Sequence, residues 1–181
     1  MFNKESYDNI YKTKATYQRH YTGLRFFPVW RYVASLVIDS PFVIDIGCGC
    51  GHLAHLLYDM GLNDLIGYDF SKEGIKRSRE KAPVFKFIQS DLMEVDFVKA
   101  TYVSTEVFEH IEDDKALISK LVRGCQLVFS VPNYKAPNHY RTYNGEAYIR
   151  EYYKDLLNIK SVKEFKQNEK DSIFVIDSIV L

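Results

Sequence analysis

The chain has 181 residues, of which 46% are hydrophobic and 27% are charged, and its formal net charge at pH 7 is zero. This length is typical of one domain, and this apolar share is enough to fill a core and argues against disorder. The balanced charge excludes a whole-chain field that would attract nucleic acid, and no apolar run approaches the roughly 20 residues of a membrane span. Three cysteines are too few for a disulfide scaffold. Together with a start that does not read as a signal peptide, they predict a cytoplasmic protein.

The predicted elements alternate along the chain, as in an α/β sheet. An apolar stripe from Trp30 to Val37 predicts a first helix with Pro28 near its start, which Asp39-Ser40-Pro41 ends. The strands are predicted near residues 42–47, 64–69, 84–90, 100–105 and 125–131, and the helices near 51–61, 72–82 and 113–123. The link from Asp91 to Lys99 is short, so it has room for only a single helical turn.

The last part of the chain predicts one more helix and a hairpin. A loop from Asn133 to Asn144 precedes a helix whose apolar stripe consists of Ile149, Tyr152, Tyr153, Leu156 and Leu157. Two strands, near residues 161–167 and 172–181, are predicted to pair as a hairpin. The late strand is also an edge through which two copies could pair, so the sequence leaves the oligomeric state open.

A glycine-rich turn, Asp45-Ile46-Gly47-Cys48-Gly49-Cys50-Gly51, follows the first predicted strand directly. The next apolar run ends in Asp69, where a carboxylate is placed to accept two ribose hydroxyls. The turn departs from a dinucleotide fingerprint, because its third glycine comes one position early and His52 stands where the last glycine belongs. A carboxylate at Asp45 suits a cationic amino group or sulfonium better than a pyrophosphate. A phosphate-binding P-loop is excluded, because no Gly-Lys-Ser/Thr follows.

From about Phe42 to Asn133 the chain resembles the class I S-adenosylmethionine-dependent methyltransferases. The glycine turn is similar to their first motif, D-I-G-C-G-T-G, with Cys50 where threonine is common. The resemblance implies that S-adenosylmethionine is the cofactor, that Asp69 holds its ribose, and that Asp91 contacts its adenine amino group. The expected cofactor-binding residues are Asp45, Gly47, Cys48, Gly49, Gly51, Asp69, Phe70, Asp91, Leu92 and Glu106.

The same resemblance implies a fold and a division of the chain. We expect a Rossmann-like, doubly wound αβα sandwich with a mostly parallel seven-stranded sheet whose last strand is antiparallel. Residues 41–181 are expected to form the methyltransferase domain, and residues 1–40 a helical lid over the cofactor. In the lid, tyrosines alternate with basic residues, a pattern that can also stack bases and meet phosphates.

The segments expected to help the chemistry follow the fourth and fifth strands. Glu106-Val107-Phe108-Glu109-His110-Ile111 looks like the E-V-L-E-H-I segment of one large branch of the family, and Ser130–Asn133 resembles that branch's fifth-strand ending. We predict Glu106, His110 and His139 as catalytic residues, because both loops leave the same sheet edge, where the two histidines can converge, and because histidine titrates near neutrality. The alternative is that each histidine only packs in the structure.

Little chain is left for an acceptor domain, so the predicted reaction is methyl transfer to an oxygen, nitrogen or carbon nucleophile of a small molecule. We expect no metal ligand. The segment is also similar to that of the small-RNA 3′-terminal 2′-O-methyltransferases, which implies the alternative of RNA ribose methylation with Glu106, Glu109, His110 and His139 on a metal. A third hypothesis is a catalytically silent module that binds the cofactor for a partner protein.

Overall fold

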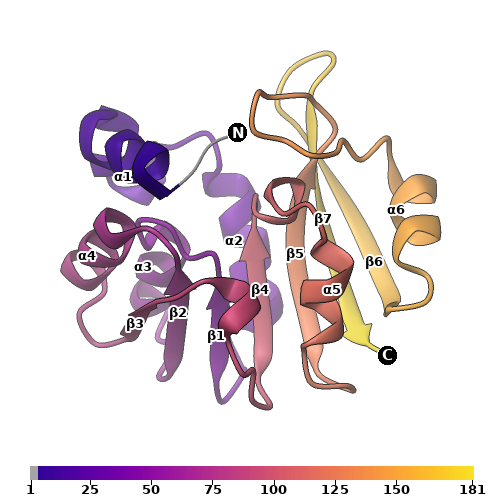
Figure 1. The fold of residues 1–181 in the computed structure, drawn as a ribbon, viewed down its shortest axis with the longest axis horizontal. Coiled ribbons are helices and arrows are strands. Elements are labelled where there is room, and N and C mark those ends of the chain that lie inside the picture. Colours follow the sequence, from indigo (N-terminus) through magenta and orange to yellow (C-terminus); the bar gives the residue numbers. More distant parts are fainter. Residues whose placement is uncertain (1–3) are drawn as a thin grey trace.

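Seven strands form one sheet at the centre of the computed structural model, which describes residues 4–181 (Figure 1). Their order across the sheet is β3-β2-β1-β4-β5-β7-β6. The bounds are β1 Val43–Ile46, β2 Leu65–Asp69, β3 Lys86–Gln89, β4 Thr101–Thr105, β5 Gln126–Pro132, β6 Leu157–Lys166 and β7 Ser172–Val180. The first five strands pair in parallel, and β7 is antiparallel to both β5 and β6. The predicted fold class is therefore confirmed.

Helices cover both faces of this sheet, as Figure 1 shows with α5 in front of it and α2 behind it. The bounds are α1 Lys4–Thr13, α2 Phe27–Val37, α3 His52–Asp59, α4 Lys72–Lys81, α5 Asp114–Ser119 and α6 Glu146–Tyr153. One hydrophobic core contains residues of α2, α3 and α4, and a second core contains residues of α5 and α6. Strand β1 separates them: Val43 belongs to the first core, and Ile44 and Ile46 to the second. This alternation follows from the two-residue period of a strand.

The structure corrects two predicted boundaries. The helix expected over 113–123 is only α5, because the chain leaves the helix after Ser119 and turns at Gly124, whose φ is 79°. The helix expected to include Leu156 and Leu157 ends at Tyr153, and Leu157 opens β6 by pairing with Val180. The last residue of the predicted helix stripe, Leu157, is therefore apolar because it is buried at the start of a strand. The single helical turn predicted between β3 and β4 is confirmed as a 3₁₀ turn, η3, at Leu92–Glu94.

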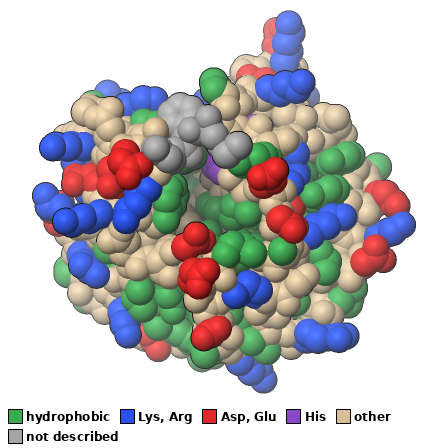
Figure 2. Space-filling model, in the orientation of Figure 1, with side chains coloured by type: hydrophobic (Ala, Val, Ile, Leu, Met, Phe, Trp, Pro, Cys, Tyr) green, Lys and Arg blue, Asp and Glu red, His purple; other side chains and the backbone are tan. Residues whose placement is uncertain are grey.

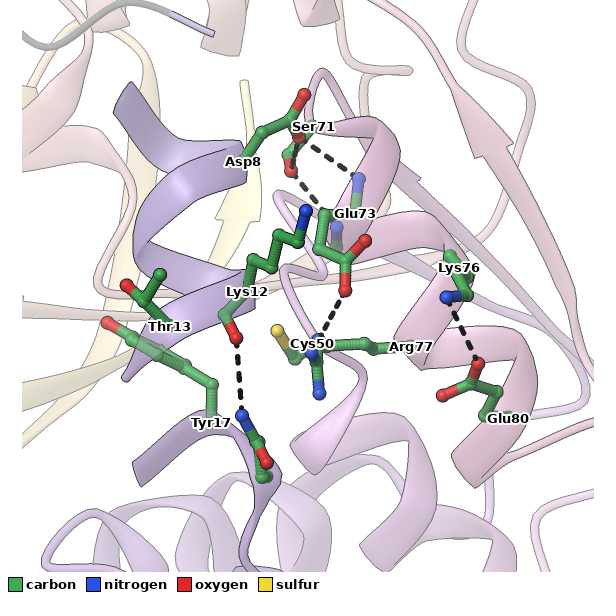
Figure 3. Close-up of polar contacts among 12 residues, drawn as sticks. Asp8, Lys12, Thr13, Tyr17, Cys50, Ser71, Glu73, Lys76, Arg77 and Glu80 are labelled. Carbon is green, nitrogen blue, oxygen red and sulfur yellow. Dashed lines mark hydrogen bonds and ion pairs between the residues drawn. The ribbon is translucent and has the colours of Figure 1, made fainter. Parts of the chain in front are cut away.

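Helix α1 lies beside α4, at the end of the sheet where the parallel strands finish (Figure 1). Figure 3 shows Asp8 reaching from α1 to the start of α4, where its carboxylate accepts hydrogen bonds from the Ser71 hydroxyl and, at 3.0 Å, from the Glu73 backbone N–H. A carboxylate there also interacts favourably with the helix dipole. The lid role of residues 1–40, and their separation from residues 41–181, stay predictions. Residues 1–3 lie outside the described part. Within residues 4–181, no helix is long and apolar enough to span a bilayer.

Candidate active site

The glycine-rich turn connects β1 to α3 with a backbone that requires glycine. Gly47, Gly49 and Gly51 have φ angles of 74°, 53° and 73°, in the left-handed region that side chains disfavour. A Cβ at Gly47 would also lie 2.5 Å from Cγ2 of Val107. The turn therefore packs directly against the segment that follows β4. We call residues 47–51 the glycine loop.

Two buried carboxylates lie beside the glycine loop. Asp69, 4% exposed at the end of β2, accepts hydrogen bonds from the backbone N–H of Gly49 at 2.9 Å and of Ser71 at 2.8 Å. Burial raises the pKa of Asp69 to about 6, against the lowering effect of these two bonds. Asp45 is 2% exposed and its Oδ2 has no hydrogen-bond partner. Burial, followed by the charge of Asp69, raises the pKa of Asp45 to about 7. A cationic ligand would relieve both carboxylates, so a sulfonium cofactor fits this side of the site.

The remaining predicted cofactor residues lie at the ends of β1, β2 and β3. Phe70 follows Asp69, and its ring centroid is 5.2 Å from that of Tyr7 in α1. Leu92 is buried, and Asp91 is exposed and accepts a hydrogen bond from the Met93 N–H at 2.9 Å, which caps η3. Cys48 is buried, with its sulfur 4.0 Å from the Ser78 hydroxyl. Its thiol faces the α4 helix, so only its backbone is suited to a cofactor contact.

Two tyrosines of α1 cover the glycine loop. The Tyr11 ring is 9% exposed, and a Cβ at Gly49 would lie 3.1 Å from its hydroxyl. The Tyr7 hydroxyl accepts a hydrogen bond from the Asn138 side-chain amide at 2.8 Å. These contacts place α1 between the glycine loop and the loop after β5, which is the position that a lid requires.

Glu106 follows β4 and is partly buried. Its φ is 56°, a conformation that is uncommon for any residue except glycine and that often occurs at functional sites. The Ser130 hydroxyl donates a hydrogen bond to Oε1 at 2.9 Å, and the Tyr134 hydroxyl donates one to Oε2 at 3.4 Å. Burial raises the pKa of Glu106 to about 7, against the lowering effects of Ser130, Arg25 and Tyr134.

Glu109, His110 and His139 converge a short distance away. One donor atom from each of these three residues lies within 4.8 Å of the other two, and the two imidazole centroids are 4.9 Å apart. His110 follows β4 in a 3₁₀ turn, η4 (Phe108–His110), and His139 is in the loop after β5. Burial lowers the pKa of His110 to about 4 and also lowers that of His139. The predicted convergence of the two histidines is confirmed. Figure 2 shows hydrophobic side chains gathered in the middle of this face, with histidine atoms at the surface above them.

Comparisons with known proteins agree with this arrangement. Residues 43–126 match the sequence model of a methyltransferase domain. Trans-aconitate 2-methyltransferase of Rhodopseudomonas palustris (strain BisB5) is 32% identical over 121 residues, which make up 62% of this chain and 47% of that protein. The N-methyltransferase NodS of Bradyrhizobium japonicum WM9, solved with S-adenosyl-L-homocysteine, has a TM-score of 0.75 at 15% identity, with 97% of both chains covered. Magnesium protoporphyrin IX methyltransferase of Synechocystis PCC 6803, also solved with S-adenosyl-L-homocysteine, has a TM-score of 0.65 at 20% identity. The match covers 84% of this chain and 80% of that one.

Residues 43–126 belong to a methyltransferase domain, and the fold is that of the S-adenosylmethionine-dependent methyltransferases. The predicted family and cofactor are therefore confirmed, while the roles of single residues stay predictions. The chain spans about half the length of the trans-aconitate methyltransferases that it matches.

The sequence did not single out the residues that hold the histidine loops of this methyltransferase in place. Asp114 is fully buried in α5 and accepts hydrogen bonds from the hydroxyls of Tyr143, Tyr152 and Tyr153 at 3.1, 3.0 and 2.5 Å. Arg141 lies 3.1 Å from Asp114 and also donates to the backbone carbonyls of Phe108, Ile111 and Glu112. The tyrosine-rich stretch of the sequence was the one indication of these hydrogen bonds, but such a stretch is equally typical of the apolar face of a helix.

Proposed function

We propose that this methyltransferase transfers the methyl group of S-adenosylmethionine to an oxygen, nitrogen or carbon nucleophile of a small molecule. The observation that carries the proposal is Glu106, a partly buried carboxyl with a φ of 56° whose neighbour Val107 packs against Gly47 of the glycine loop, and whose pKa is raised by burial. The trans-aconitate relatives and the protoporphyrin methyltransferase, named for small acceptors, support a small-molecule substrate. Three free, buried cysteine thiols support a reducing compartment such as the cytoplasm.

When bound, the cofactor supplies a methyl group that its sulfonium has already activated. In this proposal Asp69 accepts the ribose hydroxyls, while Phe70 and Leu92 flank the adenine and Asp91 meets its amino group. The glycine loop lets the ligand approach the backbone closely, because no Cβ stands in the way. The chain's main task is then to hold the acceptor atom in line with the methyl group at near-attack distance.

Glu106 is the best general base among the three predicted catalytic residues. A base acts most efficiently when its pKa lies near the working pH. Burial raises the pKa of Glu106 towards neutrality, whereas burial lowers the pKa values of His110 and His139, which makes both histidines weaker bases. In the proposed step, Glu106 accepts the proton of an oxygen or nitrogen acceptor as the methyl group moves. The hydrogen bonds from Ser130 and Tyr134 keep its carboxylate oriented.

The test is a substrate panel combined with calorimetric titration of S-adenosylhomocysteine. The panel contains small carboxylates, phenols, catechols and amines, and an RNA oligonucleotide with a free 3′-terminal ribose. For the accepted substrate, Glu106→Gln should lower kcat by about 10²- to 10⁴-fold, whereas a loss of affinity for S-adenosylhomocysteine would mean that Glu106 serves the cofactor, which is the other role predicted for it. The control is Glu112→Gln, an exposed carboxylate after the same strand, which should leave both values unchanged.

Two results would overturn the proposal. Turnover of the RNA oligonucleotide alone would establish the nucleic-acid alternative. Tight binding of S-adenosylhomocysteine without turnover of any panel member would indicate a silent cofactor-binding module.

A further inference from the structure

A group of metal-ligating side chains lies outside the active site, where the segment between α1 and α2 packs against α3. We propose that His20, His55 and Asp59 bind a divalent transition metal ion, with Zn²⁺ as the expected ion, contrary to the expectation of no metal ligand. One donor atom from each of these three residues lies within 4.8 Å of the other two. Ligands held at zinc bond lengths of about 2.0–2.2 Å lie about 3–4 Å apart, so small side-chain rotations close the set.

Two of the proposed ligands come from one face of α3. His55 and Asp59 are one helical turn apart, at positions i and i+4, and Nε2 of His55 lies 3.8 Å from Oδ2 of Asp59. This spacing is the one with which a helix presents two side chains to a single zinc ion. Burial lowers the pKa of His55, against the raising effect of the Asp59 charge. The imidazole is therefore neutral near pH 7, as a metal ligand must be.

The third ligand precedes a 3₁₀ turn, η2 (Tyr21–Gly23), which lies on α3. The ring centroids of His20 and His55 are 5.0 Å apart, and the two planes meet at 76°. Nδ1 of His20 lies 2.9 Å from the Thr22 hydroxyl oxygen and 3.4 Å from the Thr22 backbone nitrogen. Because a hydroxyl can accept as well as donate, Nδ1 can donate its proton to Thr22 at the expense of the longer contact. Nε2 then presents its lone pair to the metal.

Tyr21 contacts all three proposed ligands and supplies an independent indication of a built site. Its ring is 7% exposed, and the ring centroid lies 4.1 Å from that of His20 and 5.2 Å from that of His55. Its hydroxyl donates a hydrogen bond to Oδ2 of Asp59 at 2.5 Å. The carboxylate can still bind a metal through its other oxygen. Ligating carboxylates are commonly held by an outer hydrogen-bond donor of this kind.

The donor set selects the kind of metal. Two imidazole nitrogens with one carboxylate oxygen suit Zn²⁺ and its first-row neighbours, whereas Ca²⁺ and Mg²⁺ prefer oxygen ligands alone. His20 and Asp59 are exposed, so an ion can reach the site from solvent and water can complete its coordination.

The place of the site in the fold indicates a structural role. Helix α3 begins directly after the glycine loop, and α1 carries the two tyrosines that cover that loop. An ion shared by His20 and α3 would fasten the segment between α1 and α2 to the core, and so stabilise the folded chain. No step of the proposed reaction passes through this ion, so the inference does not depend on the proposed function.

The experiment titrates untagged, chelator-treated protein with Zn²⁺ by calorimetry and follows thermal unfolding with and without Zn²⁺. The affinity should fall at least about 100-fold in His20→Gln and in His55→Gln, because losing a ligand costs at least as much as losing an outer partner. Tyr21→Phe keeps the ring, removes only the hydroxyl, and should weaken binding about 10-fold. Zn²⁺ should raise the unfolding temperature of the wild type but not that of the two histidine variants.

The matched control comes from the active site, where Glu109, His110 and His139 also bring three donor atoms within 4.8 Å of one another. His110→Gln should keep the Zn²⁺ binding that His20→Gln removes. Without Zn²⁺, His20→Gln should unfold within about 2 °C of the wild type and bind S-adenosylhomocysteine with the same affinity, since His20 is exposed. These two measurements separate the loss of a ligand from a loss of folding.

The proposal is overturned if the wild type binds no Zn²⁺, or if His20→Gln and His55→Gln bind it as tightly as the wild type does. Loss of binding in His110→Gln alone would place the ion in the active site and overturn the proposal as well. Because none of these measurements involves a methyl acceptor, failure of the substrate panel would refute the proposed function and leave this site standing.

Discussion

The two sides of this site are held in place by different means. On the glycine-loop side, the predicted cofactor-binding groups come mainly from short segments directly after β1 and β2, and backbone N–H groups orient the carboxylate of Asp69. On the histidine side, the groups come from loops after β4 and β5 that are distant in sequence. Side chains of two other elements, Asp114 in α5 and Tyr153 in α6, fix these loops. The first side depends on backbone conformation, and the second on a buried polar network.

The largest test of this contrast is Asp114→Ala. The substitution leaves Arg141 without its ion-pair partner and three tyrosine hydroxyls without their acceptor. Breaking a buried ion pair by removing one partner typically costs about 3–5 kcal/mol. We expect a loss of this size in the free energy of unfolding, measured by urea denaturation. The neighbouring Asp113→Ala removes only an exposed cap of α5, on the Ala116 N–H, and should cost about 1 kcal/mol. Equal effects of the two variants would contradict the role of the network.

This contrast also explains how much the sequence could predict. The glycine turn and Asp69 were predicted as one site because strand order and glycine spacing fix their geometry locally. The convergence of His110 with His139 was predicted from strand order too. The burial of Glu109 and the tyrosine hydroxyls that donate to Asp114 were not, because they depend on how α5 and α6 pack, and sequence periodicity does not encode that packing. The end of α6 was missed for the same reason: Leu157 suits a helix stripe and a strand end equally.

The second test removes the carboxylate on the glycine-loop side. Asp69→Ala should lower the affinity for S-adenosylhomocysteine by about 100-fold, since charge-assisted hydrogen bonds to two ribose hydroxyls would be lost. Calorimetry measures the affinity. His139→Ala is the matched control from the other side and should leave this affinity within about twofold. If the two variants have equal affinity for S-adenosylhomocysteine, the site does not consist of two independently built sides.

Backbone dependence can be tested at the glycines themselves. A Cβ at Gly51 would lie 2.8 Å from the Cα of Ser78, and the φ of Gly51 is 73°. Gly51→Ala should therefore cost about 2 kcal/mol of unfolding free energy, as strain in the backbone and against α4. Gly61→Ala is the control, because Gly61 has a φ of 95° but no atom within 4 Å of the added Cβ. It should cost only the backbone part, about 1 kcal/mol. Thermal unfolding of both variants measures the difference.

The smallest effect concerns the segment that joins α1 to the rest of the chain. His52 is 6% exposed, stacks on Trp30, and accepts a hydrogen bond at 3.0 Å from Lys81, which also donates to the carbonyls of Tyr17 and Cys50. Burial, then the charge of Lys81, lowers the pKa of His52 to about 3, against the raising effect of the Arg19 carbonyl, which lies 3.2 Å from the same Nε2.

The sign of the pH effect follows from this shift. Below the ordinary histidine pKa of about 6.5, His52 binds a proton in the unfolded chain but not in the folded one. The free energy of unfolding therefore decreases as the pH is lowered, until the folded pKa is reached. Between about pH 7 and pH 5.5 the wild type should lose about 1 kcal/mol more than His52→Gln. Histidines with lowered pKa values elsewhere, His55, His110 and His139, titrate in both proteins and cancel in the difference. Parallel stability curves would mean that His52 takes up a proton as readily in the folded chain as in the unfolded one, so that neither its burial nor Lys81 lowers its pKa.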